Sequence, residues 1–201
     1  MNRYCLKLVA FLAVTSSTWG FEKLPEQYLV TYGNPNAPIK VVEFFSLACP
    51  GCLRLINNDF PSIKKDYIDK GNVYWIFHLD PIDKSTLQAM ICIGRLDAEL
   101  KRKFLEQASQ KIAIREASEA CSIMQELMAA FQYLIPDLEQ MTYLKGTEEF
   151  IEAFKFLKQN DGITSFPTVE IDGKILDEYP THALLESEFL KRLNKVDSCA
   201  L

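Results

Sequence analysis

The sequence has little of what metal sites, nucleic-acid-binding proteins and membrane spans usually contain. Histidine occurs only twice in 201 residues, as His78 and His182, and neither stands at metal-ligand spacing from the motif of Cys49 and Cys52. A zinc ribbon needs a second Cys-x-x-Cys pair, and the chain has only this one. The formal net charge of -5 argues against a nucleic-acid or anionic-membrane partner. We therefore expect no metal site and no nucleic-acid interface.

A long hydrophobic run is also missing. The apolar stretch at residues 8–14 is too short to span a bilayer as a helix. It follows Arg3 and Lys7 and precedes small or polar residues up to Gly20, which is the layout of a secretory signal peptide. We predict a signal peptide at residues 1–20, with an uncleaved membrane anchor as the alternative. Its removal takes away two basic and no acidic residues, so the formal charge moves from -5 to -7.

Export would change the expected role of the cysteines. Outside the cytosol the environment favours disulfides, so an exposed cysteine pair is expected to be either a bond or a catalyst of bonds. Cys49 and Cys52 follow an apolar run at residues 41–48, which predicts a buried strand, and a helix-like pattern comes next. A strand, a turn, a cysteine pair and a helix in this order indicate a redox motif.

The position of each cysteine in this motif suggests its role. If the helix begins at Cys49, the sulfur lies where backbone N–H groups lack intrahelical partners and the helix dipole is positive, which stabilises a thiolate. Pro50 suits the first helical position because its missing N–H is not needed there. Cys52, one turn further along, is placed to attack a mixed disulfide at Cys49 and release the partner. We predict a redox-active Cys49–Cys52 disulfide.

Glu43 is out of place in the apolar run. It lies six residues before Cys49, within the predicted strand. Burying an ionised carboxylate is costly unless it is paired, so the pKa of Glu43 should rise or the side chain should have a partner. One interpretation is a carboxyl group that relays protons to and from Cys52, and the other is a solvated side chain at a sheet edge. Periodicity alone does not separate them.

The rest of the chain has β-rich ends around a helical middle. Strands are predicted at 28–32, 39–45 and 72–79, and a helix runs from Cys52 to about Lys65 with a kink or break at Pro61. Residues 84–160 show helical periodicity. After them, Asp172-Gly173 between two β-like runs predicts a hairpin, and a last helix opens at Pro180-Thr181.

After the predicted signal peptide, which contains Cys5, three other cysteines and one histidine need an interpretation. Cys121 lies on the apolar stripe of a predicted helix, and two antiparallel helices could bring it opposite Cys92, so we predict a structural Cys92–Cys121 disulfide. The alternative is two buried free thiols. Cys199 has no obvious partner and is expected to be a free tail thiol. His78 fits a core or strand-end histidine better than a catalyst.

The mature chain resembles the DsbA-like thiol:disulfide oxidoreductases, which have an α/β thioredoxin fold with an inserted helical domain. The resemblance rests on residues 43–46, on Cys49-Pro50-Gly51-Cys52, on the helical block, and on residues 166–168 followed by the Asp172-Gly173 hairpin. It implies the first part of the thioredoxin fold at 21–83, the inserted helical domain at 84–160 and the second part of the fold at 161–201.

The resemblance also implies roles for individual residues. Cys49 would be the exposed nucleophile and Cys52 its buried partner. Glu43 would be the buried acid beneath the pair, which favours the proton-relay interpretation. Pro167 would be cis and packed against the disulfide, while the backbone of Phe166 pairs with an extended substrate segment.

Two departures from the family pattern concern the site. The best-known members have a histidine where this chain has Gly51, so one source of thiolate stabilisation is missing and we expect a weaker oxidant. Phe166 is larger than the valine or threonine often found before the cis-proline. It either narrows substrate choice or adds an apolar contact.

These observations predict a periplasmic or otherwise exported protein-disulfide oxidase. Its substrates would be cysteine-containing secreted or envelope proteins, and the family implies reoxidation by a membrane partner of the DsbB or VKOR type. No metal or organic cofactor is required. The alternatives are a reductase or isomerase whose pair is kept reduced, or, from another class, a binding module or chaperone in which the pair is only a structural bond.

Overall fold

The computed structural model describes residues 24–115, 119–131, 148, 151–152, 155 and 163–199, without the side chains of 120, 121 and 196–199. The predicted signal peptide at 1–20 lies outside these residues. Within the described ranges, every helix is too short or too polar to cross a bilayer.

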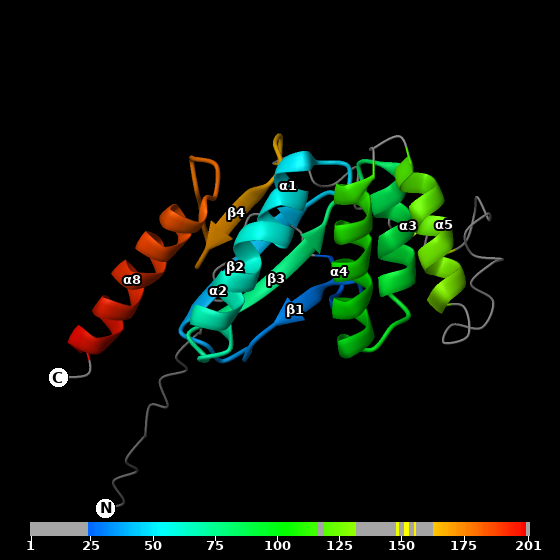
Figure 1. Cartoon of the computed structure of the whole chain (residues 1–201). Coiled ribbons are helices and arrows are strands. Elements are labelled where there is room, and N and C mark those ends of the chain that lie inside the picture. The colour runs from blue at the N-terminus through cyan, green and yellow to red at the C-terminus, as the bar shows by residue number, and fades with distance from the viewer. Residues whose placement is uncertain are drawn as a thin grey trace, which may run out of the picture.

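A five-stranded mixed sheet forms the centre of the molecule (Figure 1). The strands lie in the order β1-β3-β2-β4-β5, and β2 pairs with β3 in parallel and with β4 antiparallel. Their bounds are β1 (Val30–Tyr32), β2 (Ile39–Phe45), β3 (Val73–Leu79), β4 (Thr168–Ile171) and β5 (Lys174–Ile175). β2 is therefore the central strand, which agrees with its continuous run of buried residues from Val41 to Phe45.

The two edges of the sheet, at the hairpin and at β1, can be compared with the prediction from the sequence. The predicted hairpin is confirmed, because Asp172 and Gly173 have φ angles of 49° and 84°, and a two-residue hairpin turn of the I′ type needs positive φ at both positions. The predicted strand at 28–32 is too long. Tyr28 ends the short helix η1 (Glu26–Tyr28), whose first turn starts after Pro25, so the strand begins only at Val30.

One helical run follows the central strand. It extends from Pro50 to Ile68, slightly beyond the predicted end, as α1 (Pro50–Arg54), η2 (Leu55–Asp59), α2 (Phe60–Ile63) and η3 (Lys64–Ile68). The η2 segment is a π-helical turn that ends two residues before Pro61. Proline cannot donate the usual helical hydrogen bond, and a π-turn widens the helix where that bond is missing. The predicted kink at Pro61 is therefore a local change of helix type.

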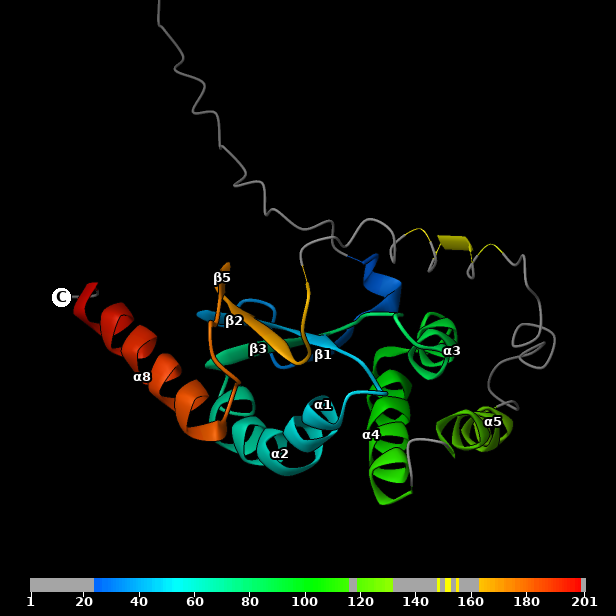
Figure 2. The same ribbon diagram turned by 90° about the horizontal axis from the view of Figure 1, so that it is seen from above.

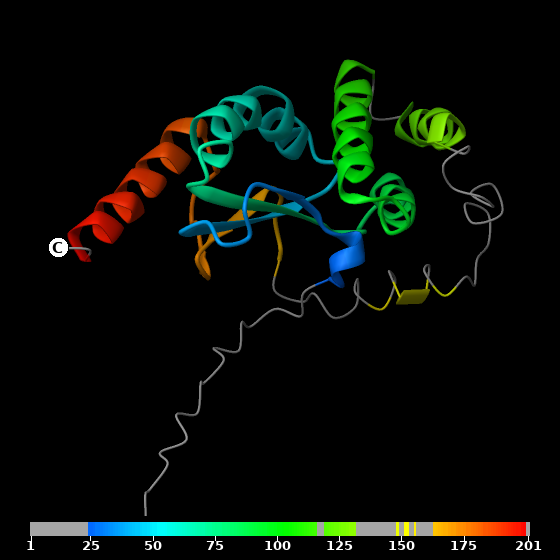
Figure 3. The same ribbon diagram turned by 90° about the horizontal axis from the view of Figure 1, so that it is seen from below.

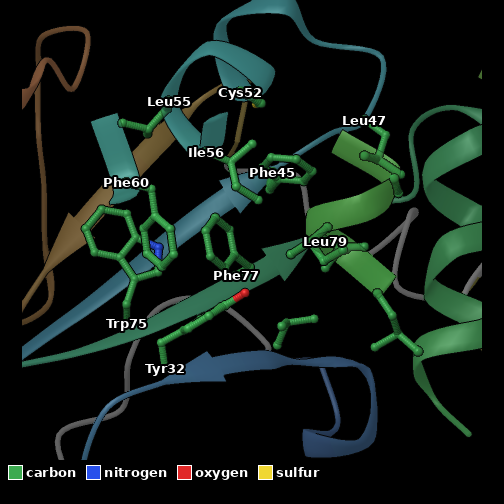
Figure 4. Packing of buried hydrophobic residues seen from close by; sticks show 14 of the residues in the cluster. Tyr32, Phe45, Leu47, Cys52, Leu55, Ile56, Phe60, Trp75, Phe77 and Leu79 are labelled. Atoms are coloured by element: carbon green, nitrogen blue, oxygen red, sulfur yellow. The ribbon is translucent and has the colours of Figure 1, made fainter. Parts of the chain in front are cut away.

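The helices around the sheet are mostly on one side. α1, α2 and α8 (His182–Cys199) lie on the same face, whereas η1 lies on the opposite side (Figures 2 and 3). Under α1 and α2 an aromatic cluster fills the core (Figure 4). The Phe60 ring meets Tyr32 and Phe77 edge to face, with centroid distances of 4.9 and 5.0 Å. Such pairs stabilise a core beyond their area alone.

The described part of the chain between β3 and β4 is largely helical, as predicted. Its helices are α3 (Lys84–Ile93), α4 (Ala98–Ile114) and α5 (Ala120–Phe131). Sequence analysis did not single out α4, although Asp97 caps it by accepting hydrogen bonds from the N–H groups of Glu99 and Leu100. Its buried side chains Phe104, Leu105, Ala108 and Ile112 repeat at helical spacing.

The predicted Cys92–Cys121 disulfide is not decided by this structure. Cys92 is a buried thiol whose pKa burial raises to about 12. The side chains of Cys121 and Cys199 lie outside the described residues. The pairing therefore stays a prediction.

Peptide mapping without reductant tests this pairing. In protein purified under oxidising conditions, we expect a peptide pair joined through Cys92 and Cys121, and closure of that loop would stabilise the fold by about 3 kcal/mol in the chain-entropy model. Free alkylation of both cysteines in the unfolded, unreduced protein would rule it out.

Asp83 joins the helical insertion to the loop that carries the cysteines. It caps α3 by accepting from the N–H of Thr86 at 2.9 Å, and it also accepts the Ser46 hydroxyl at 2.8 Å. The Thr86 hydroxyl in turn accepts from the backbone N–H of Leu47 at 2.8 Å. Burial alone would raise the pKa of Asp83, but hydrogen bonds from Ser85, Thr86 and Ser46 outweigh it and hold this pKa below its ordinary value. The Asp83 carboxylate thus holds the start of α3 against the loop that leads to Cys49.

We expect Asp83→Ala to cost about 2 kcal/mol of stability, at the upper end for helix caps, because it also frees the loop before Cys49. Since the folded pKa of Asp83 is depressed, this loss should be largest above the ordinary aspartate pKa of about 3.9 and shrink as pH falls through the folded pKa. Urea unfolding of both proteins at several pH values measures it.

Asp97→Ala is the matched control, because Asp97 caps α4 in the same way without a contact to the cysteine loop. It should cost about 1 kcal/mol and leave the thiol reactivity of the protein unchanged. Equal effects of the two substitutions on thiol reactivity would contradict the role assigned to Asp83.

Candidate active site

The two cysteines of the motif differ in exposure. Cys49 is half-buried and forms the N-cap of α1, with Pro50 at the first helical position, as predicted. Cys52 is completely buried and belongs to the hydrophobic core beneath α1 (Figure 4). An incoming sulfur can therefore reach Cys49 but not Cys52.

A second segment, far along the chain, completes the surroundings of Cys49. The Cys49 thiol donates a hydrogen bond to the carbonyl oxygen of Phe166 at 3.2 Å. The peptide bond between Phe166 and Pro167 is cis, which confirms that prediction. Pro167 is buried, whereas Phe166 is half-buried and packs against the core. The structure thus brings together the two segments that the sequence singled out.

Gly51 has a steric reason to be glycine. A Cβ atom added there would lie 2.9 Å from Cδ of Pro167, 3.2 Å from Cε2 of Tyr179 and 3.6 Å from the Cys49 sulfur. The first of these distances is too short for any real Cβ contact. The Tyr179 hydroxyl also donates to the Gly51 carbonyl at 3.0 Å. Sequence analysis missed Tyr179, because this contact joins residues 128 positions apart and no local pattern marks it.

Glu43 lies in the interior of the sheet, so the alternative of a solvated side chain at a sheet edge is wrong. In β2 it stands opposite Phe77 of β3 and Val169 of β4, and it is 0% exposed. Neither carboxyl oxygen has a hydrogen-bond partner among the described residues. Burial raises the pKa of Glu43 well above its ordinary value, the nearby indole N–H of Trp75 offsets this in part, and a thiolate at Cys49 would raise it further.

Cys52 and Glu43 influence each other. The pKa of the Cys52 thiol is raised, first by burial and then by the negative charge that an ionised Glu43 would carry, while the backbone N–H of Ser46 lowers it in part. Both groups therefore favour their protonated forms. Two negative charges side by side in this dry site would be costly, so a proton that leaves one of them is readily taken by the other.

His78 is a structural residue. It is buried on β3 at the position opposite Phe44, and its Nε2 accepts a hydrogen bond from the backbone N–H of Leu24 at 3.3 Å. This agrees with the expected core or strand-end histidine. In the described part of the chain, no three His, Cys, Asp or Glu side chains are grouped so that they could hold a metal ion.

Glu43→Gln should change how stability depends on pH. A carboxyl group with a raised folded pKa binds its proton more tightly in the folded state, so stability falls as pH rises above the ordinary glutamate pKa of about 4.3 and continues to fall up to the folded pKa. Glutamine is neutral and nearly isosteric, and the variant should lack this fall. Urea unfolding of both proteins at several values between about pH 4 and about pH 8 gives the free energy of unfolding as a function of pH. The same pH dependence in both proteins would contradict burial of an unpaired carboxyl at this position.

Known proteins with similar sequences match the chain in part. A segment of 46 residues is 50% identical to disulfide bond formation protein D of Bacillus subtilis, and it covers 22% of this chain and 20% of that protein. A segment of 79 residues is 33% identical to a putative protein-disulfide oxidoreductase of Rickettsia bellii, and it covers 38% of this chain and 30% of that protein. The matches thus span less than a third of these relatives.

Solved structures match over nearly the whole chain. Wolbachia pipientis alpha-DsbA1 superimposes with a TM-score of 0.71 at 23% identity, covering 89% of this chain and 96% of that one. Oxidised BdbD from Bacillus subtilis superimposes with a TM-score of 0.64 at 20% identity, covering 87% and 98%. These structures share the thioredoxin fold with an inserted helical region that the sequence predicted. The thioredoxin family model matches residues 26–190, and the chain therefore belongs to the thioredoxin family.

Proposed function

We propose that this protein is an exported thiol:disulfide oxidoreductase that introduces disulfide bonds into secreted or envelope proteins through Cys49 and Cys52. One observation carries the proposal: the half-buried Cys49 thiol lies against the Phe166 carbonyl beside the cis Pro167, with Cys52 buried behind it. The names of the relatives, disulfide bond formation protein and protein-disulfide oxidoreductase, support the same activity.

The reaction transfers two electrons from the substrate to the enzyme. A substrate thiolate attacks the Cys49 sulfur of the oxidised pair, so that a mixed disulfide forms and the Cys49–Cys52 bond breaks, leaving a Cys52 thiolate. The second substrate thiolate then attacks the substrate sulfur of the mixed disulfide and releases Cys49. The substrate gains its disulfide and the enzyme is left with two reduced cysteines.

Glu43 supplies the proton that the first step requires. The Cys52 sulfur is released into a buried site where its thiolate form is disfavoured. Burial raises the pKa of Glu43 and so favours its protonated form, from which it can protonate Cys52 and regain a proton later. In the reverse step the same carboxylate takes the Cys52 proton and frees the thiolate for attack.

The loop at Phe166 and Pro167 holds the substrate. An extended substrate segment pairs with the backbone of Phe166, so that its cysteine lies over Cys49. In the oxidised protein Cys49 is bonded to Cys52 and has no thiol hydrogen, so the Phe166 carbonyl that accepts the Cys49 hydrogen bond in the reduced form is available for a substrate N–H. Once the pair is reduced, the Cys49 thiol can take that carbonyl back, which favours release of the product.

The enzyme must be reoxidised after each cycle. Export through residues 1–20 would bring it to a compartment that favours disulfides. A quinone-linked membrane protein of the DsbB or VKOR type would take the two electrons. A structural bond in a binding module is the less favoured alternative, because a structural bond does not need one half-exposed sulfur beside a peptide-binding loop.

The test is oxidation of a reduced two-cysteine peptide by the oxidised protein, followed by mass spectrometry. Cys49→Ser should reduce the rate to that of the uncatalysed control, because the attacked sulfur is gone. Cys52→Ser has no disulfide to donate and should be equally inactive in this assay. Given the peptide in its disulfide form instead, its Cys49 thiolate should accumulate the mixed disulfide, because no Cys52 thiol is present to resolve it. Cys92→Ala is the control and should retain the rate. Full activity of Cys49→Ser would favour the binding-module alternative.

A redox titration against glutathione separates oxidase from reductase. With glycine in place of the usual histidine at position 51, we expect a potential more reducing than the roughly −120 mV of DsbA but still above the roughly −270 mV of thioredoxin. A value as high as that of DsbA would refute the weaker-oxidant hypothesis, whereas a value near that of thioredoxin would favour the reductase alternative.

A further inference from the structure

Tyr179 is an exposed aromatic residue held at the active site by several contacts. It belongs to the segment between β5 and α8 and is 40% exposed, while the next residue, Pro180, is buried. Its hydroxyl is tied to the Gly51 carbonyl, and the Arg54 guanidinium lies over its ring at 5.9 Å from the centroid. The ring is therefore fixed in place although it faces solvent.

The ring occupies the space that a side chain at position 51 would need. The Cβ position at Gly51 is 3.2 Å from the Tyr179 ring and 3.6 Å from the Cys49 sulfur. The ring and the sulfur thus border the same small volume. Tyr179 therefore borders the Cys49 sulfur on the side of Gly51, and Phe166 borders it on the segment that accepts the Cys49 hydrogen bond.

The tyrosine keeps its proton in the working range of the enzyme. Burial raises the pKa of Tyr179, Arg54 partly offsets this, and negative charges at Asp59 and at the two cysteines raise it further. The hydroxyl consequently stays a donor to Gly51 when Cys49 or Cys52 becomes a thiolate. The ring therefore stays in position through the reaction.

We propose that Tyr179 is a specificity-determining residue of the thiol exchange: its ring contacts the substrate residues next to the reacting cysteine and favours aromatic ones. This rests on the proposed function above. Aromatic side chains gain most from packing on another ring that is already immobilised, because little further conformational entropy is lost. Gly51 is the matching half of this arrangement, since a side chain there would press on both Pro167 and the Tyr179 ring.

The experiment compares two peptide disulfides that differ only in the residues flanking the cysteine, which are tyrosine in one and glycine in the other. The rate of exchange with the reduced protein is measured for each, and the ratio of the two rates is the readout. Because a ratio cancels the concentration of active protein, partial unfolding of a variant does not affect it.

We expect the wild type to prefer the tyrosine-flanked peptide about 5-fold, which corresponds to about 1 kcal/mol. Tyr179→Ala should reduce this ratio to near one, and Tyr179→Phe, which keeps the ring, should retain most of it. Leu190→Ala is the control, since Leu190 is similarly exposed at 47% on α8, and it should leave the ratio unchanged.

Two results would overturn the proposal. One is a wild type without preference, and the other is a Tyr179→Ala variant that slows both peptides equally, because that marks a purely structural residue. A wild type that exchanges with neither peptide would overturn the proposed function itself, and this inference with it.

Discussion

The pairing of β2 with β4 is the constraint on which the site depends. β2 ends at Phe45, four residues before Cys49, and β4 begins at Thr168, directly after the cis Pro167. Because Phe44 stands opposite Thr168 in this antiparallel pair, the segment ahead of β4 must pass beside the segment that follows β2. The two loops thus meet at the same end of the sheet. There the Cys49 thiol donates to the carbonyl of Phe166, 117 residues further along the chain. Glu43, on the same strand, is carried into the interior beneath them.

Much of this arrangement follows from sequence signals that act over short distances. The apolar run of β2, the proline after Cys49 and the Asp-Gly turn each reflect local backbone chemistry, and each predicted the element that the structure contains. The cis bond at Pro167 and the burial of Glu43 were predicted through the family resemblance. Periodicity had left Glu43 undecided, because a seven-residue strand buried on both faces has no alternation that would distinguish an edge from a centre.

The residues that sequence analysis missed act across long separations. Sequence analysis did not single out Asp83, yet its carboxylate accepts a hydrogen bond from Ser46 across 37 residues. Gly51 was interpreted only by comparison with the histidine that the best-known family members have at this position. Its neighbours in space, Pro167 and Tyr179, come from distant parts of the chain. No periodicity or capping rule includes such contacts, since they exist only after the sheet has formed. They are also the contacts that shape the surroundings of Cys49.

The burial of Cys52 next to Glu43 has a thermodynamic consequence for the environment in which the protein works. A sulfur that is released from a disulfide into this site binds a proton, because its thiolate form is disfavoured there. Reduction of the pair thus takes up a proton as well as electrons. For a two-electron couple, each proton taken up shifts the midpoint by about 30 mV per pH unit. The reduction potential of the cysteine pair therefore depends on the pH of the surrounding medium. The same pair accepts electrons more readily in an acidified compartment than in a neutral one.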